Sequence, residues 1–193
     1  MENPDSSSGA PLRYAEDEAR AALWFFADEH EHLKGPAATR ARVLAALGQH
    51  DYLHFICHGR AVLGSPLDSG LLLSGSTLSL RDIMAARTAA SLVVLSACET
   101  AVTGTTLPDE VVGLPAGFLQ AGASGVVGSL WAVPDATTAA LMALFYQSWR
   151  GRGEAPAHAL RRAQQQLRDE LVRTRGPVAA HPSLWGAFIY VGQ

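Results

Sequence analysis

Four short apolar runs along the chain have the length and composition of β-strands. They cover residues 52–57, 91–98, 124–131 and 185–191 and are rich in aliphatic and aromatic side chains. Runs of this kind, bounded by polar or turn-forming residues, are typical of strands. The second run, Ser-Leu-Val-Val-Leu-Ser-Ala-Cys, is the clearest of the four, and it predicts a strand that ends at Cys98.

Segments typical of helices lie between these runs. Residues 13–32 predict a first helix, and residues 38–47 predict a second one that ends at Gly48. Another helix begins at Ser79, because Asp82 stands at the spacing of a capping box. Further helices are expected over residues 113–122, 135–149 and 154–173. Arg and Gln side chains give the last of these a solvated face.

The alternation of helices and strands predicts an α/β fold in which a mostly parallel sheet has helices on both faces. With 193 residues, 48% of them hydrophobic and 17% charged, the chain is long enough for one buried core and somewhat short for two. We therefore expect a single domain over residues 13–193. Residues 1–12 are rich in Ser, Pro, Asn and Gly and predict an irregular lead-in.

The charge of the chain makes nucleic acid an unexpected partner. The formal net charge is -3, and no Lys or Arg cluster is interleaved with aromatic residues. The start of the sequence does not resemble a signal peptide, and there is no apolar run of about 18 residues, so we expect no membrane span. With two cysteines, the composition favours a reducing, cytoplasmic location.

Two reactive side chains stand at the ends of predicted strands. His58 and Gly59 follow the run at 52–57, and Cys98 ends the run at 91–98. If these strands are parallel, their carboxyl ends lie at the same edge of the sheet, where open α/β sheets place their sites. A thiol and an imidazole at one edge have the arrangement of a cysteine peptidase. The alternative is a buried structural cysteine and a packed histidine.

His54 and Cys57 raise two further possibilities, a metal site with His58 and a disulfide with Cys98. Alternation along a strand places the two histidines on one face and Cys57 on the other, which disfavours both. No predicted strand is followed by a glycine-rich phosphate-binding loop that opens a helix. The sequence therefore predicts neither a metal nor a nucleotide cofactor.

Several motifs, in order along the chain, resemble those of the CHAT domain, a family of caspase-like cysteine peptidases related to separase. They are His-Phe-Ile-Cys-His-Gly at 54–59, Leu-Ser-Ala-Cys-Glu-Thr at 95–100, Gly-Leu at 113–114, Phe-Leu-Gln-Ala-Gly-Ala at 118–123, Ser-Leu-Trp at 129–131, Ala-Leu-Arg at 159–161 and His-Pro at 181–182. Two features depart from the family pattern. Ala101 stands where the family has glycine, and we expect the family's first strand to be missing, since Asn3-Pro4 comes almost at the start.

The resemblance implies roles for individual residues. Cys98 would be the nucleophile, and His58 would be the general acid and base, because an imidazole titrates near neutral pH. The backbone N–H groups of Gly59 and Cys98 would form an oxyanion hole. The substrate pocket would be lined by Ser129, Trp131, Asp135 and Glu99, with Asp68 as a weaker candidate for the same wall.

Asp135 also has a purely structural interpretation. It stands at the predicted start of a helix, before Ala136, where Asp is a favoured N-cap residue. An N-cap carboxylate binds the backbone of its own helix, whereas a pocket carboxylate would select a basic residue before the scissile bond. The sequence leaves both interpretations open.

The function that the resemblance implies is that of an endopeptidase that cuts a protein partner. Family members are commonly joined to helical repeats or other sensor domains, so a regulatory partner or a fused repeat domain is expected. The Thr- and Gly-rich segment at 101–108 follows the thiol and is placed to shape the substrate cleft. The alternative is a catalytically silent CHAT-type module that binds a peptide or a neighbouring domain.

Overall fold

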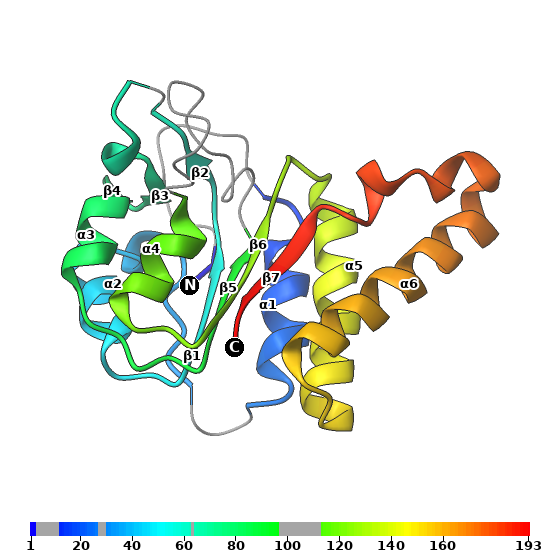
Figure 1. Cartoon of the computed structure of the whole chain (residues 1–193), viewed down its shortest axis with the longest axis horizontal. Coiled ribbons are helices and arrows are strands. Elements are labelled where there is room, and N and C mark those ends of the chain that lie inside the picture. Colours follow the sequence, from blue (N-terminus) through cyan, green and yellow to red (C-terminus); the bar gives the residue numbers. More distant parts are fainter. Residues whose placement is uncertain (3–11, 27–29, 63, 97–112) are drawn as a thin grey trace. The chain divides into compact units, whose positions relative to one another are not determined.

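The structure, a computed structural model, describes residues 1–2, 12–26, 30–62, 64–96 and 113–193 (Figure 1). The chain forms two compact units. The first contains Met1–Pro11, His32–Ala132 and Val191–Gln193, and the second contains Leu12–Glu31 and Val133–Tyr190. That the two fold together as the single domain expected from the sequence stays a prediction.

The first unit is built on a sheet with the strand order β1-β5-β6-β7. The strands are β1 (Tyr52–Ile56), β5 (Leu92–Ser96), β6 (Gly125–Ser129) and β7 (Phe188–Gly192), which enters this unit at Val191. β5 pairs in parallel with β1 and with β6. Every residue of β5 and β6 is buried, which explains why both strands are nearly continuous apolar runs. The predicted α/β class with a mostly parallel sheet is confirmed.

Met1 and Glu2 occupy the outer edge of β1. The Ile56 N–H donates to the Met1 carbonyl at 2.9 Å, and Glu2 makes parallel bridges to Ile56 and to Lys34. The buried Glu2 carboxylate lies 2.8 Å from His32 Nε2 and 3.3 Å from Lys34 Nζ. The expected absence of the family's first strand concerns a part of the chain that includes residues 3–11, which lie outside the described residues, so it stays a prediction.

Three short strands form a second, antiparallel sheet in the same unit, in the order β2-β3-β4. They are β2 (Gly59–Arg60), β3 (Gly70–Leu73) and β4 (Ser76–Ser79). The sequence pattern does not predict this sheet, because β2 has only two residues and β3 is buried throughout and lacks alternation. β3 and β4 approach closely at Gly70, where a Cβ would lie 2.1 Å from the Leu78 carbonyl oxygen.

Three helices of the first unit lie on one side of its parallel sheet (Figure 1). They are α2 (Arg40–Leu47), α3 (Leu80–Ala85) and α4 (Leu114–Ala121), and short 3₁₀ turns occupy Gly35–Ala37 and Pro66–Asp68. The capping box predicted for α3 is confirmed: the Asp82 N–H donates to Ser79 Oγ and the Ser79 N–H donates to Asp82 Oδ2, both at 3.1 Å. The C-cap residue of α4 is Gly122, whose φ of +115° is in the left-handed region.

The apolar core of the first unit joins its helices to both sheets. Its larger members include Val43, Leu47, Phe55, Leu71, Leu78, Ile83, Val93, Leu95, Phe118 and Val126. The rings of Phe55 on β1 and Phe118 on α4 have centroids 5.6 Å apart. Since residues of β3 and β4 belong to the same cluster as residues of β1 and β5, the small sheet is fixed against the parallel sheet by apolar burial.

Helices form most of the second unit. α1 (Ala15–Leu23) packs against α5 (Asp135–Tyr146), and α5 packs against α6 (Pro156–Arg175). α5 continues into a π-helical turn at Gln147–Gly151, and 3₁₀ turns follow α6 at Pro177–Ala180 and Pro182–Leu184. None of the helices in the described part of the chain is long and apolar enough to cross a bilayer.

An aromatic cluster explains why α1 is shorter than the helix predicted at 13–32. Phe26, beyond the end of α1, packs its ring against Tyr146 and Trp149, with both pairs of ring centroids 6.2 Å apart. The Arg150 guanidinium lies over the Phe26 ring at 5.0 Å. Burial, with a smaller contribution from the Glu18 carboxylate, raises the pKa of Tyr146 far above its usual range, so its hydroxyl stays protonated.

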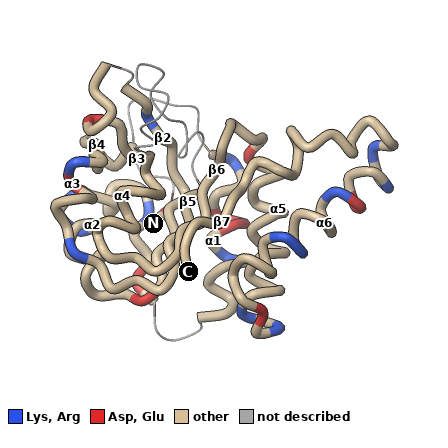
Figure 2. The backbone as a smooth tube through the Cα atoms, in the orientation of Figure 1, with Lys and Arg blue, Asp and Glu red and all other residues tan. Residues whose placement is uncertain are grey.

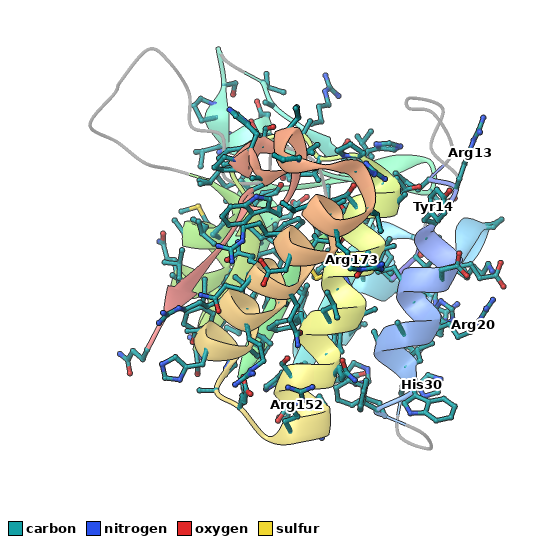
Figure 3. The ribbon with its side chains drawn as sticks, turned by 90° about the vertical axis from the view of Figure 1, so that its right-hand side faces the viewer. Arg13, Tyr14, Arg20, His30, Arg152 and Arg173 are labelled. Carbon is teal, nitrogen blue, oxygen red and sulfur yellow. The ribbon has the colours of Figure 1, made fainter. Side chains whose placement is uncertain are left out.

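α6 has one apolar face and one charged face. Its buried side chains recur at helical spacing at Ala159, Leu160, Ala163, Leu167 and Leu171. Ion pairs on the other face join Arg162 to Glu154, Arg168 to Asp169 and Arg173 to Glu170. Figure 2 shows basic and acidic positions along α6, and Figure 3 shows the Arg173 side chain. The solvated face predicted for this helix is therefore confirmed.

Candidate active site

The last residues of three parallel strands lie side by side as register partners, and we call this line of residues (Ile56, Ser96 and Ser129) the register row. Ile56 at the end of β1 is the register partner of Ser96 at the end of β5. β5 and β6 pair at Val94 and Val127, so the same register, continued by two residues, brings Ser96 opposite Ser129. His58 lies two residues after Ile56, and Trp131 lies two residues after Ser129. In the sequence, Cys98 follows Ser96 by the same two residues.

Alternation along β1 separates the imidazoles from the thiol of Cys57. Leu53, Phe55 and Cys57 belong to the apolar core, and Cys57 is only 1% exposed. His54 and His58, at the intervening positions, are half-buried. Cys57 therefore lies on the side of this segment that faces the core, with Leu53 and Phe55, and the two histidines at positions of the other parity are outside that core cluster. The described residues contain no group of three or more His, Cys, Asp or Glu side chains that could hold a metal ion.

His58 is held by the small antiparallel sheet. Its carbonyl oxygen accepts the Leu72 N–H at 2.9 Å, immediately before β2 begins. The sheet also pairs Gly59 with Leu71 and Arg60 with Gly70. Because β1 and β2 are separated by only Cys57 and His58, the imidazole sits where the parallel sheet passes into the antiparallel one.

The hydrogen-bond pattern of this sheet fixes the direction of the Gly59 amide. In an antiparallel pair, residues that exchange hydrogen bonds alternate with residues that do not. The bond from Leu72 to His58 makes their pair a hydrogen-bonded one, so the next pair, Gly59 and Leu71, is not hydrogen-bonded. The Gly59 N–H therefore points away from β3, toward the outer edge of β2.

A bond on the other side of β3 supports this direction independently. The Leu80 N–H donates to the Ser69 carbonyl at 2.7 Å, which makes Ser69 and Leu80 a hydrogen-bonded pair. By the same alternation, Leu71 exchanges its hydrogen bonds with Leu78 of β4 and not with Gly59. β2 is an edge strand of its sheet, so nothing in the sheet covers the Gly59 amide from outside.

The candidate pocket residues on β6 lie at the end of that strand. Ser129 is its last residue and is 2% exposed, while Trp131 is half-buried two residues later. Leu130, between them, is 39% exposed. Cys98, Glu99 and the segment at 101–108 lie outside the described residues.

Asp135 does not cap its own helix, so the N-cap prediction is wrong. α5 begins at Asp135, its N-cap residue is Pro134, and no side chain provides the cap. Instead, Asp135 Oδ2 accepts the Tyr14 N–H at 2.8 Å, and Tyr14 is the N-cap residue of α1 (Figure 3). The carboxylate thus lies near the amino-terminal ends of two helices, where the helix dipoles favour a negative charge. This partner is 121 residues away in the sequence, which is why local spacing did not indicate it.

Asp68, the weaker pocket candidate, is engaged within the loop that follows β2. Its carboxylate accepts the Ser65 hydroxyl and lies 3.4 Å from the Arg81 guanidinium. The Ser65 hydrogen bond, followed by that of Arg81, lowers the pKa of Asp68. Asp68 is therefore an exposed, ionised residue of the first unit that binds Ser65 of its own loop and Arg81.

Comparison with known proteins agrees with this architecture. A family profile described as CHAT domain matches residues 1–193. Tetratricopeptide repeat protein 28 of Homo sapiens is 27% identical over 199 residues, which cover 83% of this chain and 8% of that protein. The protein of the same name from Mus musculus is 27% identical over 224 residues, which cover 95% of this chain and 9% of that protein. The chain thus spans less than a tenth of the length of these curated relatives.

Proposed function

Because this chain belongs to the CHAT domain family, a peptidase-like family, we propose that it is a cysteine endopeptidase with Cys98 and His58 as its catalytic dyad. The register row of Ile56 and Ser96 is the observation that carries the proposal. His58 follows one member of this row by two residues, and Cys98 follows the other by the same number. Equal offsets from one row of parallel strands favour a meeting of imidazole and thiol at one edge of the sheet.

In the proposed reaction, the Cys98 thiolate attacks the carbonyl carbon of a peptide bond. The carbon–nitrogen bond of the tetrahedral intermediate then breaks, and protonated His58 delivers its proton to the leaving amine. Neutral His58 next takes a proton from water, whose oxygen attacks the thioester. The carbon–sulfur bond breaks, which releases the new carboxyl group and restores Cys98. One water molecule is consumed for each peptide bond.

The amide of Gly59 supplies the proposed oxyanion donor, together with that of Cys98. The direction of the Gly59 N–H, away from β3 and toward the outer edge of β2, supports this role. A glycine here also allows close approach of a substrate carbonyl, since it has no Cβ. Two amide donors aimed at the developing oxyanion stabilise it more than they stabilise the ground-state carbonyl.

Ser129 and Trp131 are the proposed walls of the pocket for the residue before the scissile bond. Ser129 belongs to the same register row as Ile56 and Ser96, and Trp131 stands at the same offset as His58. The indole provides a broad apolar surface beside the proposed dyad. Glu99 is a further candidate on the family resemblance alone. For Asp135, which the resemblance also implies, we propose the structural role of binding the Tyr14 N–H.

A helical-repeat partner is the proposed source of regulation. The curated relatives are named as tetratricopeptide repeat proteins, and more than nine tenths of their length lies beyond the region matched here. We propose a repeat domain, fused or separate, that controls access of a protein substrate, and a cytoplasmic location for the reaction. The names of these relatives describe repeats and not an activity, which favours a silent peptide-binding module as the second candidate.

The experiment that separates the two candidates is labelling with a thiol-reactive peptidyl probe. The proposed peptidase reacts at Cys98, and His58→Ala lowers the rate by about 100-fold or more, because the general base is lost. His54→Ala, which replaces a half-buried histidine on β1 four residues before His58, is the matched control and retains labelling. A rate at Cys98 that is the same in wild type and His58→Ala contradicts the dyad and supports the silent module.

A further inference from the structure

A side-chain hydrogen bond holds the loop that follows β2 to the start of β3. Ser69 Oγ accepts the Val62 N–H at 2.9 Å, in a partly buried position. We infer that Ser69 is a positioning residue for the Gly59 amide in the proposed oxyanion hole. This inference rests on the proposed function for its catalytic meaning, while the geometry on which it depends belongs to described residues of the first unit.

The Ser69 hydroxyl replaces a missing rung of the antiparallel ladder. His58 with Leu72 and Arg60 with Gly70 are successive hydrogen-bonded pairs, so the next amide to face β3 is that of Val62. By register, its partner on the other strand would be the Asp68 backbone, but that residue lies in a 3₁₀ turn. The Ser69 hydroxyl accepts the Val62 N–H instead, and this bond adds one more connection between the chain after β2 and the start of β3.

Ser69 is itself fixed from three sides. Its carbonyl accepts the Leu80 N–H at 2.7 Å, at the first residue of α3. Its neighbour Gly70 is confined by β4, because any Cβ there would lie 2.1 Å from the Leu78 carbonyl oxygen. The capping box of Ser79 closes the start of the same helix. The Ser69 hydroxyl is therefore held in place by β3, β4 and the start of α3. Through its bond to the Val62 N–H, it fixes the chain that follows Gly59 relative to these elements.

The position of β2 depends on the bond between Ser69 and Val62 more than that of a longer strand would. It has two residues, and within the described sheet it is an edge strand paired only with β3. The Leu72 bond fixes its start at His58, and the Ser69 bond fixes the chain beyond Arg60. Gly59 lies between these two anchors. Without the second anchor, the pair of Arg60 and Gly70 becomes the last one of the ladder and frays more readily. A displacement of about 1 Å at a reacting group can lower a rate by about 100-fold.

The test compares two reactions of the Cys98 thiol that differ in their need for an oxyanion hole. Iodoacetamide alkylates sulfur by displacing iodide and forms no oxyanion. Acetyl-tripeptidyl aldehydes, used as a mixture, form a carbon–sulfur bond while the carbonyl oxygen becomes the hemithioacetal oxygen. Protection of Cys98 from iodoacetamide by the aldehydes, followed by peptide mapping, gives the aldehyde affinity and the thiol reactivity in one assay.

Ser69→Ala is expected to weaken aldehyde protection by about tenfold or more and to leave the iodoacetamide rate within about twofold of wild type. Ser69→Thr, which keeps the hydroxyl, should restore protection. Ser65→Ala removes a hydroxyl from the same loop, where it binds Asp68, and serves as the matched control. Aldehyde protection of Ser69→Ala within twofold of wild type overturns the inference.

Amide hydrogen exchange keeps this test separate from that of the proposed function. Ser69→Ala should accelerate exchange at Val62, whose N–H loses its acceptor, and at Arg60, whose pair with Gly70 lies beside it, while the amides of β5 keep their protection. If wild-type Cys98 is alkylated but never protected by aldehydes, the peptidase proposal fails. Unchanged exchange at Val62 and Arg60 in Ser69→Ala overturns the positioning role, whatever the aldehyde result.

Discussion

Side chains point alternately to opposite faces along β1 and the two residues that follow it, and this alternation separates Cys57 from His58. Cys57 is buried in the core, while His58, one residue later, is half-buried at the end of the strand. This separation follows from local alternation, so the sequence alone predicts it correctly. The bond between Asp135 and Tyr14 and the bond between Ser69 and Val62 are different. They join residues across a turn or across the unit, and no local pattern specifies them.

Asp135 gives a prediction at this scale. Asp135→Ala removes the acceptor of the Tyr14 N–H and a negative charge near two helix ends, and it should lower the free energy of unfolding by about 1 kcal/mol. Asp135→Asn keeps an acceptor oxygen and should cost less. Urea unfolding measures both changes. We expect the residue preferred before the cut in a peptide library to be the same in all three proteins.

A selective loss of products cut after Arg in Asp135→Asn would contradict this account. It would show that the carboxylate recognises substrate in addition to binding Tyr14. Equal stability of Asp135→Ala and wild type would count against the structural role itself.

Asp82 gives a prediction with a defined pH window. Hydrogen bonds from Arg40, at 3.0 and 2.6 Å, and from Ser79 lower the pKa of this carboxyl from 3.8 to about 2. The unfolded chain therefore binds the proton more readily, and the pair stabilises the fold fully above about pH 4. That contribution, about 1–2 kcal/mol, disappears as the pH falls from about 4 to about 2.

Urea unfolding of wild type and Asp82→Asn across this range measures the effect. The difference in unfolding free energy should be constant from pH 7 to about pH 4.5 and should shrink below pH 4. Arg40→Gln, which removes the partner cation, should show the same pH dependence. A difference that is already lost at pH 5, or one that does not change down to pH 2.5, would refute the assignment.

At the scale of elements, apolar runs and capping residues carry most of the information. The runs at β1, β5 and β6 and the capping box of Ser79 and Asp82 are local signals, and each predicts its element. The second sheet escapes prediction because β2 is too short to show a period. The length of α1 escapes it because the Phe26 ring packs against residues of α5 and its continuation, far away in the sequence.

The contact of β3 with β4 leads to a prediction about Gly70. In Gly70→Ala the new Cβ would clash with the Leu78 carbonyl oxygen, which is backbone and cannot move away cheaply. We expect a loss of about 2 kcal/mol or more in unfolding free energy. Gly64→Ala is the control, because a Cβ at Gly64 meets no atom within 4 Å. Equal stability of the two variants would show that β3 and β4 are less closely packed than described here.

At the scale of the whole molecule, the family assignment and the register row support each other. The profile covers the entire chain, and the row of Ile56, Ser96 and Ser129 places family motifs at the ends of adjacent parallel strands. The curated relatives are more than ten times as long as the region they share with this chain. We therefore propose that catalysis belongs to the first unit of this chain and that regulation comes from a repeat domain.

The most direct measurement of the central claim is a count of new protein amino termini by isotope-labelled mass spectrometry. Cells that produce the wild-type chain are compared with cells that produce Cys98→Ala or His58→Ala. We predict a set of cleavage sites that is present with wild type and absent with both variants, at equal protein abundance. The same cleavage sites at the same intensity with Cys98→Ala as with wild type would contradict the account.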